Sequence, residues 1–189
     1  MDAKFDCGLC ILRRWEPPDK TSLIRHANNK KVSRNLRDRF PFPYTDAHAN
    51  AFLAAACDPN SRDFVYAIVV GGEAVGGIGA HPRKDVERHS AEIGYWLGED
   101  FWGRGIATAA VRKLSHHVLR ELDIYRIFAT VFASNPASAR VLEKAGFMRE
   151  GLMSRAVLKD GVLIDSALYA ITRDPGLPRI QWGDRQSEK

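Results

Sequence analysis

Residues 91–111 constrain the fold of this chain most, because they predict a strand, a tight turn and a helix in immediate succession. The strand is expected over residues 90–97, and the helix begins within the run Gly103, Arg104, Gly105. The first N–H groups of a helix lack intrahelical partners and carry partial positive charge, so a phosphate can bind there. Gly103, Gly105 and Ala107 leave room for its approach, although the glycines can equally serve the turn alone.

Two common phosphate-binding loops do not fit this stretch. A Walker loop requires Gly-Lys-Ser/Thr after its first glycine, and no such run is present. A dinucleotide fingerprint requires a third small residue where Thr108 stands. The anion site therefore belongs to another class.

Length and charge favour a single domain with an anionic ligand. The 189 residues, 45% hydrophobic and 27% charged, suffice for one sizeable core. The formal charge of +5 suits a phosphate-bearing molecule. The basic residues are dispersed between acids without a recognition-helix or aromatic-platform motif, so nucleic acid is not expected as a partner.

The chain is expected to be cytoplasmic. It contains no apolar run long enough to span a membrane, and its start lacks a signal peptide's apolar core. Three cysteines cannot all pair, which suits a reducing compartment. Cys7 and Cys10 form a lone Cys-x-x-Cys before a strand, which favours two ordinary cysteines over a redox or metal site, and no metal is expected.

The order of elements predicts a single α/β (α+β) three-layer domain, a mixed sheet with helices on both faces. Strands are expected at 9–15, 64–70, 74–80, 90–97, 126–131, 147–158 and 162–171. Helices are expected after Pro17, at 46–56 capped by Thr45, from the glycine turn to 122, and from Asn135-Pro136 to Gly146. Residues 81–88 read as a polar loop. The domain covers 1–172, and 173–189 form a loosely attached polar tail.

The segment 34–44 is rich in both prolines and aromatic residues. It cannot form a regular helix, and it is too apolar to be a solvated loop. It is expected to pack either as one wall of a cleft or as a buried connector. Its candidate ligand-binding side chains are Arg37, Asp38, Phe40 and Tyr44.

Three motifs in order resemble the GNAT superfamily of N-acetyltransferases. The run WGRGIA at 102–107 is similar to the pyrophosphate loop, Arg/Gln-x-x-Gly-x-Gly/Ala, with Trp102 in the leading position. NPASA at 135–139 and EKAGF at 143–147 are similar to the signatures of the RimJ/RimL-like branch, which acetylates ribosomal-protein N-termini. The resemblance covers roughly residues 9–172.

The resemblance implies a mostly antiparallel sheet that splays at its central strands and holds acetyl-CoA in the opening. Backbone groups of Trp96 and Leu97 would pair with the pantetheine arm, and the Trp96 N–H would stabilise the oxyanion. The remaining implied cofactor contacts are Gly103, Arg104, Gly105, Ile106, Ala107, Thr108, Asn135 and Ser138.

The resemblance also implies candidate catalytic residues. Glu92, on the central strand, is the candidate base, against a purely structural role or a water relay. Many family members carry a tyrosine that acts as the catalytic acid where Leu142 stands here. The resemblance implies Ser138 as the substitute donor to the leaving thiolate, and the alternative role for Ser138 is local helix capping. An acid found in some relatives falls at Val157.

The expected activity is direct acetyl transfer from acetyl-CoA to a primary amine, which the resemblance implies is a protein N-terminus. A polyamine or aminoglycoside acceptor is the first alternative. A non-catalytic sensor that binds acyl-CoA or another nucleotide is the second. The chain is expected to be a monomer or a homodimer.

Overall fold

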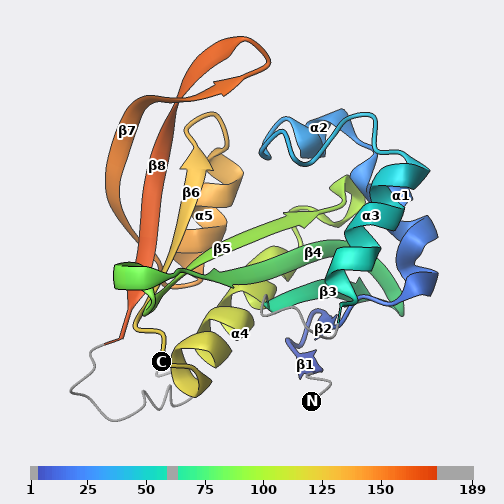
Figure 1. The fold of residues 1–189 in the computed structure, drawn as a ribbon, viewed down its shortest axis with the longest axis horizontal. Helices are drawn as coiled ribbons and strands as arrows, with labels where there is room; N and C mark the ends of the chain where they lie inside the picture. The colour runs from blue at the N-terminus through green and yellow to red at the C-terminus, as the bar shows by residue number, and fades with distance from the viewer. Residues whose placement is uncertain (1–3, 59–63, 174–189) are drawn as a thin grey trace, which may run out of the picture.

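An eight-stranded sheet forms the centre of the molecule in the computed structural model, which describes residues 4–58 and 64–173 (Figure 1). The strand order is β1-β2-β3-β4-β5-β6-β8-β7. The strands are β1 (Phe5–Asp6), β2 (Ile11–Arg13), β3 (Phe64–Val70), β4 (Glu73–Pro82), β5 (Ser90–Leu97), β6 (Arg126–Phe132), β7 (Met148–Lys159) and β8 (Val162–Thr172). All neighbours pair antiparallel except β5 and β6, which are parallel. The expected mixed, mostly antiparallel sheet is confirmed.

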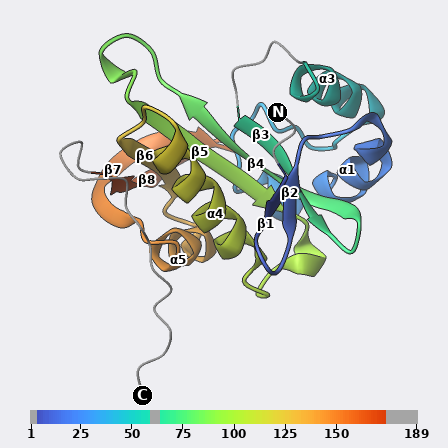
Figure 2. The same ribbon diagram turned by 90° about the horizontal axis from the view of Figure 1, so that it is seen from below.

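Helices cover both faces of the sheet (Figure 2). They are α1 (Lys20–Ala27), α2 (Lys30–Ser33), α3 (Asp46–Ala56), α4 (Ile106–Glu121) and α5 (Pro136–Lys144), with short 3₁₀ turns at Pro17–Asp19, Asp85–Glu87 and Glu99–Phe101. One buried cluster joins the sheet to α4 and α5, and a second joins it to α1 and α3. This is the predicted three-layer arrangement. Within the described ranges, no helix is both long and apolar enough to cross a membrane.

Helix α5 is held at both ends by the residues that predicted it. The side chain of Asn135 accepts the N–H of Ser138 at 3.2 Å, which caps the helix start. Gly146 follows the helix with φ of 99°, and the Phe147 N–H donates to the Leu142 carbonyl at 3.0 Å. This is a Schellman ending, which needs a residue that tolerates the left-handed conformation.

The sheet opens between β5 and β6. Their pairing covers only Ser90 with Arg126, Ala91 with Ile127 and Glu92 with Phe128. Beyond Glu92 the two strands diverge, as Figure 1 shows, so the rest of β5 has no strand partner on that side. The expected splay is confirmed.

Three details differ from the sequence-based expectation. A short strand, β1, pairs with β2, and two residues are too few to give a periodic signal. Strand β4 continues through Pro82, which moves His81 from the expected loop into the sheet, opposite Glu92. Arg173 is anchored, because its N–H donates to the Tyr125 carbonyl at 2.7 Å and its guanidinium lies over the Tyr125 ring. The remaining tail residues, 174–189, lie outside the described part.

We expect Thr45→Ala to destabilise the protein by about 1 kcal/mol, the usual cost of losing a helix N-cap. The Thr45 hydroxyl accepts the N–H of His48, and the His48 ring accepts the Thr45 N–H in return. Urea unfolding of the variant measures the change. Thr45→Ser keeps the cap and should stay close to wild type, whereas equal losses in both variants would contradict a capping role.

Candidate active site

A cavity of about 1040 Å³ occupies the opening of the sheet. Its floor and edges come from β4, β5 and β6, and its walls from segment 34–44, α3, the glycine turn and α5. It is lined by nearly all of the predicted site residues: Glu92, Trp96, Leu97, Gly103, Gly105, Ile106, Ala107, Thr108, Asn135, Ser138, Arg37, Phe40 and Tyr44. The exceptions are Asp38 and Arg104.

The glycine turn leaves the start of α4 open. Gly103 and Gly105 have φ of 74° and 77°, left-handed values that favour glycine. The first backbone donor within the helix is the Ala109 N–H, which reaches the Gly105 carbonyl at 3.0 Å, so the preceding amides are available to an anion. The Arg104 guanidinium instead lies over the Phe101 ring, 5.4 Å from its centroid, so only its main chain belongs to the turn.

Trp102, which replaces the usual Arg or Gln, ties this turn to the central strand. Its indole Nε1–H donates to the Leu97 carbonyl at 2.7 Å. The bond fixes the end of β5 relative to the start of α4. The substitution therefore keeps a donor at this position without keeping a positive charge.

The free backbone edge of β5 is set by strand alternation. The Gly98 N–H donates to Val75 in β4, and the Trp96 carbonyl points at Gly76 of β4. Even-numbered residues of β5 therefore pair with β4, and odd-numbered residues turn their backbone groups to β6 and the opening. The β5–β6 pairing at Glu92 takes up the Ile93 N–H, and Trp102 takes up the Leu97 carbonyl, which leaves the Ile93 carbonyl, the Tyr95 main chain and the Leu97 N–H facing the opening. This corrects the expected role of the Trp96 N–H, which is turned away from the cavity.

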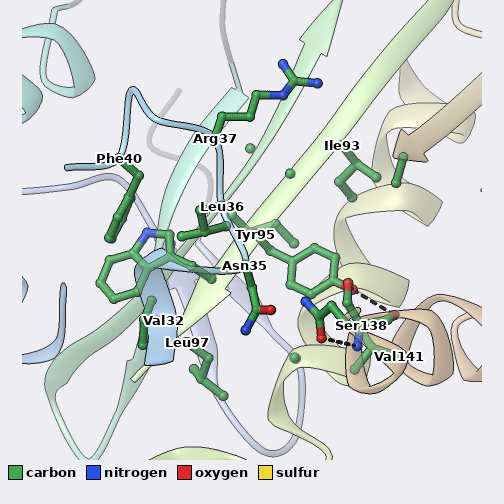
Figure 3. Close-up of a pocket in the computed structure, with 18 of the residues that line it drawn as sticks. Val32, Asn35, Leu36, Arg37, Phe40, Ile93, Tyr95, Leu97, Ser138 and Val141 are labelled. Atoms are coloured by element: carbon green, nitrogen blue, oxygen red, sulfur yellow. Dashed lines mark hydrogen bonds between the residues drawn. The ribbon is translucent and has the colours of Figure 1, made fainter. Parts of the chain in front are cut away.

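Ser138 and Tyr95 meet across the opening (Figure 3). Their hydroxyl oxygens are 2.8 Å apart, and the Tyr95 hydroxyl also lies 3.2 Å from the Ser138 carbonyl. Burial raises the pKa of Tyr95 to about 12, despite the opposing effect of the Ser138 hydrogen bond. Tyr95 therefore stays protonated at physiological pH and can donate to Ser138. The Ser138 N–H caps the helix with Asn135, which leaves its hydroxyl available.

Neither of the other expected acid positions supplies a hydroxyl or carboxyl group. Leu142 is fully buried in the core, and the neighbouring residue that lines the cavity is Val141. Val157 pairs with Ile164 in the β7–β8 hairpin and does not line the cavity. Ser138 with Tyr95 is thus the hydroxyl pair that this site offers.

Glu92 lines the cavity from the last position of β5 that pairs with β6. Its Oε1 accepts an ion-pair hydrogen bond from Nη2 of Arg37, and its side chain is 19% exposed. His81 stands opposite it on β4 and lines the same cavity. Sequence reasoning missed His81 because it was assigned to a loop.

Segment 34–44 forms a wall of the cavity rather than a buried connector. The Phe40 ring packs between Trp96 and Tyr44, with centroid distances of 5.3 and 5.2 Å. Burial raises the pKa of Tyr44 to about 12, so it presents a neutral ring. Asp38 departs from expectation, because its carboxylate turns away to Lys159 Nζ at 2.6 Å and does not line the cavity.

Cys57 and the Cys7–Cys10 pair lie outside this arrangement. All three cysteines are unpaired, and none lines the cavity. The Cys57 thiol donates to the Trp15 carbonyl at 3.2 Å, and burial raises its pKa, both of which lower its nucleophilicity. Among the described residues, no group of three potential ligands is placed to hold a metal ion.

Comparison with known proteins agrees with this geometry. Residues 10–148 match the family model for the acetyltransferase (GNAT) domain. The chain belongs to the GNAT acetyltransferase family. The match covers the glycine turn, the opening and α5, and therefore the whole candidate site of this family member.

The relatives of this chain include proteins named as ribosomal acetyltransferases. The putative ribosomal N-acetyltransferase YdaF of Bacillus subtilis is 35% identical over 102 residues, 54% of this chain and 55% of YdaF. The ribosomal-protein-serine acetyltransferase of Escherichia coli is 33% identical over 94 residues, 50% of this chain and 52% of the relative. The chain thus spans about half the length of these curated relatives.

The fold also matches solved acetyltransferases. RimL, a ribosomal L7/L12 alpha-N-protein acetyltransferase solved in complex with Coenzyme A, superposes with a TM-score of 0.80. The alignment covers 90% of this chain and 98% of RimL at 24% sequence identity. At that identity the likeness establishes the fold.

Proposed function

We propose that the protein transfers an acetyl group from acetyl-CoA directly to a primary amine, a protein N-terminal α-amine. One observation carries the proposal: the free edge of β5, the open start of α4 and the Ser138–Tyr95 pair all face one cavity. An acetyl-CoA site needs these three parts, which are a strand edge for pantetheine, amides for pyrophosphate and a donor beside the sulfur.

The residues present fit acetyl-CoA, which supplies an activated acetyl thioester. The amides from Gly103 to Thr108 would hold the pyrophosphate, with Arg140 and Lys144 on the same cavity to balance its charge. The main chain of Tyr95 and the N–H of Leu97, whose carbonyl is taken by Trp102, would hold the pantetheine as an added strand. Asn135 would act by fixing α5, because its side chain already caps Ser138.

The two faces of β5 separate the chemical tasks. Glu92 lies on the same face as Trp96, which packs with the α1 and α3 cluster, whereas Tyr95 packs on the α4 and α5 side. Glu92 would remove a proton from the acceptor ammonium, and the neutral amine would then attack the carbonyl carbon. Ser138, oriented by Tyr95, would donate to the sulfur as the C–S bond breaks. The Tyr95 N–H, the first β5 donor beyond the pairing with β6, is the candidate oxyanion donor.

A protein N-terminus suits this site better than a lysine side chain. An α-amino group has a pKa near 8 against about 10.4 for lysine, so a single carboxylate or water relay suffices to deprotonate it. The names of the ribosomal relatives support the same acceptor. A cytoplasmic setting is part of this proposal, and the three unpaired cysteines support it.

Steady-state assays across acceptor classes test the acceptor. Short N-terminal peptides are expected to give higher kcat/KM than polyamines and aminoglycosides. The turned-away Asp38 supports this order, because it removes from the cavity an acid that a small polycation would use. Acetylation of the small cations with no peptide product would overturn the N-terminal assignment and leave the acetyltransferase intact.

Glu92→Gln is expected to lower kcat/KM by about tenfold at pH 7 and to approach wild type above about pH 9. A neutral amine needs no base, and the α-amine is already deprotonated at the higher pH. A pH–rate profile measures the effect. The exposed Glu87→Gln, which loses the same charge outside the cavity, is the control. Parallel profiles for Glu92→Gln and wild type would assign proton removal to water.

A further inference from the structure

The charge of the cavity is unbalanced. Among the described residues that line it are four basic side chains, Arg37, Arg39, Arg140 and Lys144, and a single carboxylate, Glu92. Arg140 and Lys144 belong to α5, beside the proposed pyrophosphate site. Arg37 and Arg39 belong to segment 34–44, on the acceptor side. An acceptor that approaches along this segment meets two cations before it meets the base.

Within segment 34–44, the side chains of residues 37–39 point alternately into the cavity and away from it, which places their two basic side chains inside and the acidic one outside. Arg37 and Arg39 line the cavity, whereas the intervening Asp38 turns outward to Lys159, whose side chain is 12% exposed. The single acid of the segment is thereby removed from the acceptor path. Arg39 has no ion-pair partner among the described residues, so its charge is available to a ligand.

Arg37 forms an ion pair with Glu92, the carboxylate that the acceptor amine needs. Its guanidinium is hydrogen bonded to Glu92, and its side chain is 51% exposed. An incoming ammonium group competes with Arg37 for the same Glu92 oxygen. When it displaces the guanidinium, Arg37 loses its partner and becomes available to pair with an anionic group of the acceptor.

The floor beside Glu92 has room for a peptide main chain. Gly94 on β5 stands opposite Gly79 on β4, between Glu92 and Trp96. Gly94 is exposed, and a Cβ built there would meet no atom within 4 Å. An extended acceptor main chain can therefore lie over Gly94 beside Glu92, with the His81 ring over the neighbouring Gly79 as its other boundary.

From these contacts we infer that the acceptor is a protein N-terminus with an acidic residue at its second or third position. The acceptor ammonium replaces Arg37 on Glu92, and the acceptor carboxylate binds the released Arg37 together with Arg39. Arg37 and Arg39 are thus specificity-determining residues. The inference rests on the proposed function and narrows its substrate class.

Three peptides that differ only at positions two and three test this inference. With Glu-Glu, Gln-Gln or Lys-Lys after an N-terminal alanine, wild type should prefer Glu-Glu over Lys-Lys by at least about tenfold in kcat/KM, through KM, since charge pairs act mainly on binding. Equal use of the three peptides, or preference for Lys-Lys, would overturn the inference. Acetylation of the Gln-Gln peptide would support the proposed function even if the inference about acidic residues failed. If no amine is acetylated, both the proposed function and this inference are wrong.

Variants identify the residues responsible. The double variant Arg37→Gln/Arg39→Gln should give similar kcat/KM values for the three peptides, whereas Arg37→Lys should keep the wild-type order of kcat/KM. Arg34→Gln, which removes the same charge outside the cavity lining, should also keep it. A merely structural role for Arg37 would lower kcat/KM for all peptides equally and would contradict the inference. If the double variant does not fold, the wild-type comparison decides alone.

Discussion

Gly105→Asp is expected to weaken acetyl-CoA binding by about 100-fold. A carboxylate at this position would lie among the amides that hold the pyrophosphate. Repulsion between unit charges about 6 Å apart costs about 3 kcal/mol at the effective dielectric of a partly buried site. The open start of α4, with Gly105 lining the cavity, is the basis of this expectation. Calorimetric titration with acetyl-CoA measures it.

Gly105→Asn is the matched control. Asparagine has nearly the same shape and tolerates the left-handed backbone at φ of 77°, but it carries no charge. Both variants should fold, because the nearest atom to a Cβ built at Gly105 is the end of the Leu9 side chain, 3.3 Å away, and Leu9 is 55% exposed and can move. Equal affinities of the two variants for acetyl-CoA would show that charge at this turn does not affect binding. The pyrophosphate site could then not be assigned to this turn.

Ser138→Ala is expected to lower kcat by about 100-fold, the usual effect of losing one donor to a charge that develops in the transition state. Alanine keeps the N–H that Asn135 caps, so the helix is preserved. The loss should persist at all pH values, in contrast to that of Glu92→Gln. Unchanged turnover with acetyl-CoA and a peptide would contradict a role at the sulfur.

Tyr95→Phe separates the donor from the residue that orients it. Because the pKa of Tyr95 is raised to about 12, its neutral form persists through pH 10, and it continues to donate to Ser138 there. The variant should therefore lose about tenfold in kcat, to the same extent at pH 7 and pH 10. A loss confined to low pH would indicate that Tyr95 titrates during turnover.

Local patterns predicted most of the fold. The alternation of β5 and the Asn-Pro start and Gly-Phe end of α5 are decided by neighbouring residues, and they appear as expected. The pairing between strands is harder to predict from the sequence. His81 joins β4 because Glu92 lies across from it, and the even-numbered backbone of β5 is taken up by β4. The direction of the Trp96 N–H depends on that pairing, so the sequence alone misassigned it.

Tyr95 was missed for a related reason. It alternates with Ile93 and Leu97, both buried, so the sequence pattern assigns it to the core. Its hydroxyl gains a role only because β6 diverges and brings α5 against it. The outward turn of Asp38 likewise depends on Lys159, which is 121 residues away. Contacts this distant leave no periodic signal.

The most direct test of direct acetyl transfer is the stoichiometry of one reaction. The protein is incubated with acetyl-CoA and an N-terminal peptide, while free thiol is followed by a colorimetric reagent and acetylated peptide by mass spectrometry. We predict one thiol released for each acetylated α-amine, with no acetyl group on the protein itself. Acetyl-CoA binding without thiol release for any amine would contradict catalysis and identify the protein as a sensor.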